Sequence, residues 1–177
     1  SEGLKIVGID HNDRTSEGWR DDLSQTMQSF TQDHTSEFHP DSIDPHHWGF
    51  IRERLTFTKG DFEAAETYRR LAQDIGGNAI FYLAVSARFF GPVVDHLGAA
   101  GLLKEGEGAF RRVVIEKPFG TDLASARALN ARILNQADES QVFRIDHFLG
   151  KETVQSILAL RFANAMLEPI WNAHHID

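Results

Sequence analysis

The sequence contains no cysteine, so it has neither a disulfide framework nor a thiolate site. It also has no apolar run near the ~20 residues that a bilayer-spanning helix needs, and its amino-terminal residues lack the pattern of a signal peptide. Positive charge is scarce, because 18 lysines and arginines face 26 acids and leave a net charge of −8. We therefore expect a cytoplasmic protein that binds neither nucleic acid nor a membrane, with any anion site being local.

A glycine-rich phosphate-binding turn is also absent from these residues. A dinucleotide-binding fold normally begins with a strand that leads into such a turn. Gly3 and Gly8 lack the required spacing, and Gly76-Gly77 follows a helical stripe, where glycine is a stop signal. The usual first strand and its glycine loop are therefore not expected within this chain.

Short apolar runs alternate with amphipathic stretches along the chain. Strands are predicted at residues 5–10, 79–85, 112–116 and 142–145. Helices are predicted at 16–31, 62–75, from Pro92 to the glycines at 98 and 101, and after a cap at 121 or 122. The last helix is expected to turn Leu123, Ala126, Ile133, Leu134 and Ala137 inward. This alternation predicts an α/β fold with a doubly wound, mainly parallel, Rossmann-like sheet.

Residues 32–47 are predicted to form a loop, because they are rich in Asp, His, Ser and Pro without a clear period. A metal site is conceivable here, yet the spacing matches no ligand motif, so a solvated loop is the favoured interpretation. The potential ligands are His34, His39, Asp41, Asp44, His46 and His47.

The strongest functional signal is the octet Arg144–Lys151, which joins an apolar strand to a helix. Such strand-to-helix junctions are where open α/β sheets bind ligands. If Lys151 opens the helix, its ammonium, the first backbone N–H groups and His147 would together hold a phosphate dianion. Asp146 can accept a hydrogen bond from an imidazole and so suits acid–base work. For any one of these residues alone, a surface charge at a strand end is the competing interpretation.

The same octet closely resembles the signature of glucose-6-phosphate dehydrogenases, in which tyrosine usually stands at the position of Phe148. Three further stretches resemble the family in its own order, so the resemblance covers nearly the whole chain. They are residues 80–85 (IFYLAV), residues 115–120 (IEKPFG), and residues 160–164 (LRFAN) with 170–172 (IWN).

This resemblance implies an oxidoreductase that transfers hydride from C1 of glucose 6-phosphate to NADP and yields 6-phosphogluconolactone, the first step of the pentose phosphate pathway. Asp146 matches the carboxylate that orients the base histidine, and Lys117 matches the lysine that contacts both nicotinamide and sugar. The implied substrate-binding residues are Lys117, His147, Phe148, Leu149, Gly150 and Lys151. Phe148 lacks the tyrosine hydroxyl and therefore one hydrogen bond to the phosphate.

The resemblance also implies cofactor contacts from Lys117, Pro118, Ser86 and Phe90. The cofactor itself stays open, because the family commonly places arginine after the strand that here ends at Asp10. An acid at that position usually accepts hydrogen bonds from a free ribose 2′-hydroxyl and would repel a 2′-phosphate. NAD or dual use is therefore an alternative to NADP, and so is an Asp10 that only caps a turn. The candidate residues are Asp10, His11 and Arg14.

By comparison with the family, residues 1–150 are expected to form a partial dinucleotide-binding domain. Residues 151–177 are then a helix and linker leading into an antiparallel catalytic domain outside this chain, which carries the base histidine. We expect the full-length protein to form a homo-oligomer and this chain alone to be inactive. The alternative is a non-catalytic fragment, or a module that binds sugar phosphate or dinucleotide without turnover.

Overall fold

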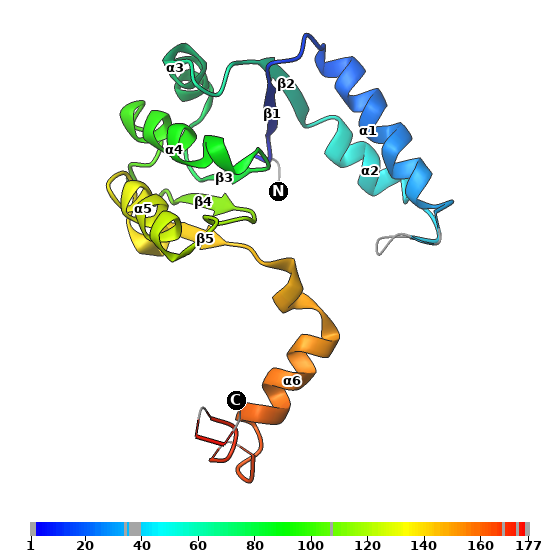
Figure 1. Ribbon diagram of the computed structural model, residues 1–177. Helices are drawn as coiled ribbons and strands as arrows, with labels where there is room; N and C mark the ends of the chain where they lie inside the picture. Colours follow the sequence, from blue (N-terminus) through cyan, green and yellow to red (C-terminus); the bar gives the residue numbers. More distant parts are fainter. Residues whose placement is uncertain are drawn as a thin grey trace. The chain divides into compact units, whose positions relative to one another are not determined.

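The computed structural model describes residues 3–33, 35, 40–106, 108–167, 169–172 and 174–175. Two compact units divide the chain, Ser1–Leu71 and Ala72–Asp177, and each is described by itself. In both units one or two helices separate successive strands (Figure 1), and every pairing between the named strands is parallel. The predicted parallel α/β class is thereby confirmed, with the strands forming one sheet in each unit.

The first unit is built on two parallel strands. Its elements are β1 (Ile6–Asp10), α1 (Ser16–Phe30), α2 (Pro45–Arg52), β2 (Leu55–Lys59) and the greater part of α3 (Ala65–Asp74). The register runs from Ile6↔Leu55 to Asp10↔Lys59, which places Asp10 at the carboxyl edge of this sheet. α3 is followed by Gly77 at φ 60°, so the second of the two predicted stop glycines takes the left-handed conformation.

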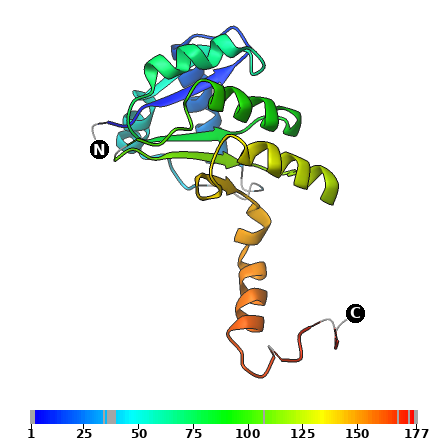
Figure 2. The same ribbon diagram turned by 90° about the vertical axis from the view of Figure 1, so that its left-hand side faces the viewer.

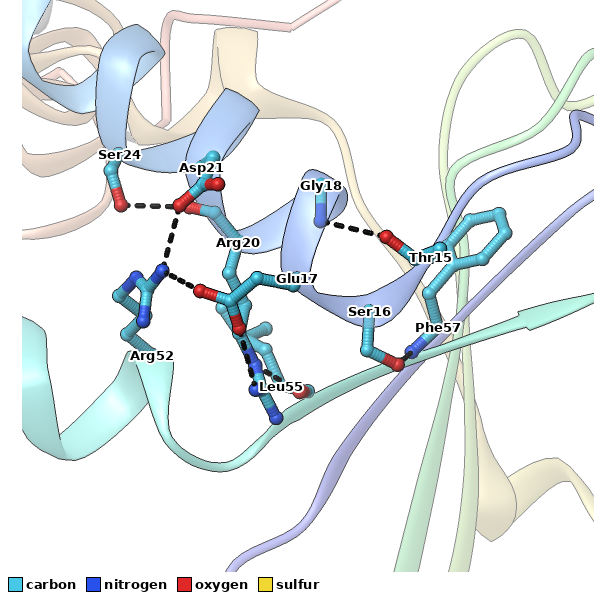
Figure 3. A network of polar contacts seen from close by, with 10 residues as sticks. All are labelled: Thr15, Ser16, Glu17, Gly18, Arg20, Asp21, Ser24, Arg52, Leu55 and Phe57. Atoms are coloured by element: carbon cyan, nitrogen blue, oxygen red, sulfur yellow. Dashed lines mark hydrogen bonds and ion pairs between the residues drawn. The ribbon is translucent and has the colours of Figure 1, made fainter.

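Side chains of α1 hold β2 by its backbone (Figure 3). The Phe57 amide donates to Ser16 Oγ at 2.9 Å, and Arg20 Nε donates to the Leu55 carbonyl at 2.9 Å. Both backbone groups lie in a strand that, within the described ranges, pairs in a ladder only with β1. The helix thus satisfies polar groups that a two-stranded sheet leaves open.

The loop predicted for residues 32–47 is too long, because α2 already begins at Pro45. Asp44 Oδ1 accepts a hydrogen bond from the His47 amide at 2.9 Å, and proline occupies the first turn. The Asp-Pro pair is a helix-start signal that the histidine-rich composition obscured. His34 and His39 lie outside the described residues, and within those ranges no cluster of three potential metal ligands occurs.

β2 is a strand that the sequence analysis did not predict. Its sequence, Leu-Thr-Phe-Thr-Lys, is rich in β-branched and aromatic residues, which suit a half-buried strand. Its five residues directly follow α2, and the apolar positions of both segments together resembled a single ordered stretch. The strand pairs along its full length with β1.

The second unit contains a three-stranded parallel sheet in the order β3-β4-β5. Its elements are β3 (Ala79–Leu83), α4 (Phe90–Ala99), β4 (Arg111–Ile115), α5 (Leu123–Leu134), β5 (Val142–Arg144) and α6 (Glu152–Phe162). Three short 3₁₀ turns join them, η1 (Ala87–Phe89), η2 (Glu139–Gln141) and η3 (His147–Gly150). Leu83 pairs with Ile115, and Ile115 pairs with Arg144, so the three strands end at a common carboxyl edge.

α4 and α5 lie together on one face of this sheet (Figures 1 and 2), and the core is between them and the strands. Its most deeply buried large side chains are Phe90, Val94, Leu97, Val113, Ile115 and Ile133. On the opposite face, the side chains of Ile80, Tyr82 and Phe143 are at least half exposed. In this unit the described helices therefore cover one face of the sheet only.

The predicted inward face of α5 is partly wrong. Ile133 and Ala137 are buried, whereas Leu123 is 66% exposed and Leu134 is 39% exposed. Successive helical residues are about 100° apart, so Ile133 and Leu134 cannot both face the sheet, and Leu123 lies well off the Ala126–Ile133–Ala137 stripe. The two leucines were predicted to face inward only because they are apolar.

The amino edge of the same sheet is closed by one buried polar side chain, Gln141. Its Nε2 donates to the Leu103 carbonyl at 2.9 Å and to the Arg111 carbonyl at 3.2 Å, and its Oε1 accepts from the Asp138 amide at 2.9 Å. Every polar atom of this amide group therefore has a partner, which makes its burial tolerable.

α6 follows η3 and makes its main contact with that turn. Its large apolar side chains remain substantially exposed, namely Ile157, Leu158, Leu160 and Phe162. Across the described part of the chain, no helix has the length and apolar character to cross a membrane.

Candidate active site at the carboxyl edge of the second sheet

The site begins where β4 and β5 end. After the last ladder pair, the Ile145 amide still donates to the Ile115 carbonyl at 2.9 Å, and the backbone pairing of β4 with β5 ends there. Lys117 and Asp146 follow directly, and Lys117 Nζ lies 2.9 Å from Asp146 Oδ1. The parallel register thus joins two of the predicted site residues, from motifs far apart in the sequence, into one ion pair.

Asp146 is held in its charged form. The Lys117 ammonium lowers the pKa of this carboxyl below its usual value, and the Phe148 amide, which donates to Oδ1 at 2.9 Å, lowers it further. The carboxylate caps the η3 turn and pairs with Lys117, which lies two residues after β4. The arrangement provides an anionic acceptor beside a cation.

The turn between β4 and α5 fixes the backbone on the far side of Lys117. The Lys117-Pro118 peptide bond is cis, and Gly120 has φ +79°. A Cβ on Gly120 would lie 2.5 Å from the backbone nitrogen of Ala126, so only glycine fits. Asp122 then caps α5 by accepting from the Ser125 amide at 2.7 Å.

The predicted phosphate-binding residues lie around η3. His147 is the first residue of this turn, and Lys151 occupies the N-cap position of α6, as expected from the sequence. Between them, Phe148 and Leu149 are 55% and 53% exposed and Gly150 is also exposed. The segment therefore presents two nitrogen-bearing side chains and the start of a helix on an accessible surface.

One of the predicted cofactor residues of this unit, Pro118, lines a cavity of about 390 Å³. Arg88, Gly120 and Arg132 also line it, while Ser86 immediately precedes its lining residues. Phe90 is fully buried and packs in the core, so it offers no side-chain surface to a cofactor. This burial argues against the predicted cofactor contact from Phe90.

Neither arginine of this cavity was predicted from the sequence. Arg132 is held by Asp95, with Nε and Nη2 at 2.7 and 2.6 Å from the same carboxylate oxygen. Arg88 follows Ser86 within one turn, and its guanidinium lies over the Phe89 ring. Its position directly after a strand end was the available signal.

In the first unit, Asp10 and Arg14 line a separate cavity of about 150 Å³. Asp10 Oδ1 lies 2.7 Å from His11 Nδ1 and accepts from the Asn12 amide at 3.3 Å. Arg14 is paired with Asp22 at 3.0 Å rather than with Asp10. The three candidate residues are thus near one another, but the carboxylate and the guanidinium each have a partner already.

These observations define a parallel α/β unit with a charged site where two strands end, the architecture of nucleotide-binding domains. Residues 1–156 match the family described as "Glucose-6-phosphate dehydrogenase, NAD binding domain". The chain belongs to the glucose-6-phosphate dehydrogenase family.

Individual relatives agree with this assignment. The chain is 40% identical over 183 residues to glucose-6-phosphate 1-dehydrogenase 2 of Mycobacterium tuberculosis, covering 98% of this chain and 34% of that protein. It is 36% identical over 189 residues to glucose-6-phosphate 1-dehydrogenase of Chlamydia muridarum, covering 100% of this chain and 36% of that protein. It spans about a third of the length of these relatives.

Solved structures show the same relationship. A crystal structure of glucose-6-phosphate 1-dehydrogenase from Mycobacterium avium matches with a TM-score of 0.75 and 35% identity, over 96% of this chain and 35% of that one. A glucose-6-phosphate dehydrogenase in complex with its substrate glucose 6-phosphate matches with a TM-score of 0.70 and 28% identity, over the same shares of the two chains.

Proposed function

We propose that this chain is the nucleotide-binding part of an enzyme that oxidises C1 of glucose 6-phosphate. Hydride passes to NADP and the product is 6-phosphogluconolactone, the first step of the pentose phosphate pathway. The observation that carries the proposal is the Lys117–Asp146 pair at 2.9 Å, which brings two family motifs together at one sheet edge. Relatives named glucose-6-phosphate 1-dehydrogenase and a homologue solved with its substrate support it.

The charged residues of the site have different roles. The phosphate binds to His147 and Lys151 across the exposed segment formed by Phe148, Leu149 and Gly150. Lys117 contacts the sugar and the nicotinamide end of the cofactor. Asp146 stays anionic, because its pKa is lowered, and it orients the histidine base that takes the C1 hydroxyl proton. That histidine is not among the motifs matched here.

The bound nicotinamide supplies the hydride acceptor, and the protein supplies binding and orientation. We propose NADP as the main cofactor, held by Lys117, Pro118 and Ser86. At the edge of the first sheet, the carboxylate of Asp10 is already bonded to His11 and Asn12, which supports the turn-capping interpretation of Asp10. Arg14 lines the cavity there and carries a charge suited to a 2′-phosphate, once it leaves Asp22. Dual use of NAD remains the alternative.

The domain boundary belongs to the same proposal. Residues 1–150 form the dinucleotide-binding part, and residues 151–177, which include α6, form a helix and linker toward the catalytic domain. The exposed apolar side chains of α6 fit a segment that is not part of the nucleotide-binding core.

The experiment measures nicotinamide reduction with glucose 6-phosphate, supplying NADP and NAD separately, in a protein that contains this chain. Lys117→Met should lower kcat/KM about 10²-fold or more, because it removes a positioned charge at the reacting centre. The matched control is Lys104→Met, an exposed lysine that precedes β4. Equal activity of the two variants would count against the assigned site.

The second candidate is a module that binds sugar phosphate without turnover. Calorimetry separates it from the enzyme, because the module binds glucose 6-phosphate while the nicotinamide absorbance stays constant. In both cases Lys151→Met should weaken glucose 6-phosphate binding by about tenfold or more, since it removes a charge-assisted contact to phosphate.

Location and assembly are further proposals that rest on composition and family. We propose a cytoplasmic homo-oligomer that binds neither nucleic acid nor membranes. Cell fractionation tests the location, and light scattering of the purified protein tests the assembly. A membrane-bound or strictly monomeric protein would contradict the respective proposal.

A further inference from the structure

A second polar contact joins the strand ends next to the Lys117–Asp146 pair. The Tyr82 hydroxyl, on the exposed face of β3, donates to the Glu116 carboxylate, which immediately follows β4. This contact lies at the end of the ladder, whose last pair is Leu83↔Ile115. It therefore continues the link between β3 and β4 at the level of side chains, just before the chain reaches Lys117.

The two contacts involve consecutive residues and together span the carboxyl edge from β3 to β5. Tyr82 ties β3 to Glu116, and the next residue, Lys117, is tied to Asp146 after β5. Among the described residues, the Glu116 side chain makes no other hydrogen bond or ion pair. Lys117 is followed by a peptide bond to proline, which has no N–H to donate. The Tyr82 hydroxyl is thus the side-chain group that holds Glu116 and Lys117 from the β3 side.

We propose that Tyr82 and Glu116 are positioning residues of the candidate active site. They hold the backbone at Glu116 so that the Lys117 ammonium stays on Asp146, and neither residue touches the substrate itself. The proposal rests on the proposed function for its catalytic consequence. Its structural part, the coupling of Tyr82 to Asp146 through Glu116 and Lys117, can be tested without turnover.

The first measurement verifies the Tyr82–Glu116 contact. The chain has only two tyrosines. Burial raises the pKa of Tyr68 to about 12, and the hydrogen bond to Glu116 raises the pKa of Tyr82. In a Tyr68→Phe background, ultraviolet titration follows Tyr82 alone. Adding Glu116→Ala should lower its pKa toward the ordinary tyrosine value, and an unchanged titration would overturn the proposal.

The second measurement follows the Asp146 carboxyl by NMR during a pH titration. Tyr82→Phe removes no charge, yet it should raise the Asp146 pKa toward its ordinary value, because the Lys117 ammonium is less well held. Tyr68→Phe is the matched control and should leave this pKa unchanged. An Asp146 pKa that is identical in Tyr82→Phe and the unaltered protein would overturn the proposal.

The sign of the Glu116 effect separates positioning from plain charge. Removing a neighbouring negative charge lowers the pKa of a carboxyl, whereas loss of the positioned lysine raises it. Glu116→Ala should therefore raise the Asp146 pKa. Glu116→Gln keeps an acceptor for the phenol and should restore most of the unaltered behaviour. A lowered pKa in Glu116→Ala would overturn the proposal.

Turnover provides the last arm. In a protein that contains this chain, Tyr82→Phe should lower kcat about three- to tenfold with little change in KM, the size expected for one charge-assisted hydrogen bond at an exposed edge. A protein that never reduces nicotinamide would refute the proposed function and leave the pKa coupling intact. Normal turnover together with an unmoved Asp146 pKa would refute the positioning role alone.

Discussion

Replacing Gly120 by alanine should destabilise the second unit more than any other single-methyl insertion at a turn. Gly120 has φ +79°, a conformation that costs alanine about 1–2 kcal/mol. The added Cβ would also lie 2.5 Å from the nitrogen and 2.7 Å from the Cα of Ala126. Both atoms are backbone in the first turn of α5, so the helix start must move, and such overpacking costs a further ~1–3 kcal/mol. The expected loss of unfolding free energy is roughly 2–5 kcal/mol.

Gly101→Ala is the matched control. Gly101 has φ +72°, close to that of Gly120, but a Cβ there would meet nothing within 4 Å. Its expected cost is the conformational part alone, about 1–2 kcal/mol. Both variants are compared by urea unfolding followed with circular dichroism, and the slope against urea should not change. Equal destabilisation of the two proteins would refute the steric argument.

The displacement of α5 should also reach the site. The turn that holds Gly120 begins at Lys117-Pro118, so moving it disturbs the ammonium that pairs with Asp146. In Gly120→Ala, the Asp146 pKa should rise toward its ordinary value, whereas Gly101→Ala should leave it unchanged. NMR titration of both variants checks this. An unchanged Asp146 pKa in a destabilised Gly120→Ala protein would show that α5 adjusts to the clash without disturbing the site.

Three further predictions concern single side chains. The pKa of Asp146 is lowered in the folded state, so its contribution to stability is present above 3.8, the ordinary pKa of an aspartate, and is lost as pH falls through the folded value. Lys117→Met should flatten this acid limb in urea unfolding measured from neutral to acidic pH. Ile133→Ala should cost about 2–5 kcal/mol of unfolding free energy because Ile133 is fully buried. Leu134→Ala, at the adjacent and 39% exposed position, should cost clearly less. Equal losses of stability in thermal unfolding would contradict the assigned face of α5. Asp122→Ala should cost about 1 kcal/mol of stability because α5 loses its cap. Amide hydrogen exchange in the first turn of α5 should become faster. Unchanged exchange there would contradict a capping role for Asp122.

Much of the fold was predictable because buried parallel strands have a clear local signature. Val113 and Ile115 lie in a continuous apolar run, and the strand stands where that run predicts. α2 and β2 were missed for the opposite reason. Their signals, an Asp-Pro cap and a short Thr-Phe-Thr alternation, are weak beside a histidine-rich stretch without period. Local composition there outweighed the few residues that decide the structure.

The site was predictable as a set of residues but not as a set of contacts. Lys117 and Asp146 both follow strands, and parallel strands share their carboxyl edge, so their proximity follows from the sequence. That Lys117, rather than His147, meets the carboxylate depends on how η3 turns. The Tyr82–Glu116 contact depends on the β3–β4 register, which was not predicted from the sequence.

The amino and carboxyl edges of the second sheet differ in burial and in polar contacts. At the amino edge, Gln141 ties the segment around Leu103 to β4 and is buried, whereas the carboxyl edge presents its charges to solvent. Changes in the buried contacts of Gln141 should therefore cost mainly stability. Changes in the exposed side chains of Phe148 and Leu149, beside the Lys117–Asp146 pair, should alter ligand preference at little cost in folding. Ligand preference can thus vary at these exposed positions while the buried amino edge is kept.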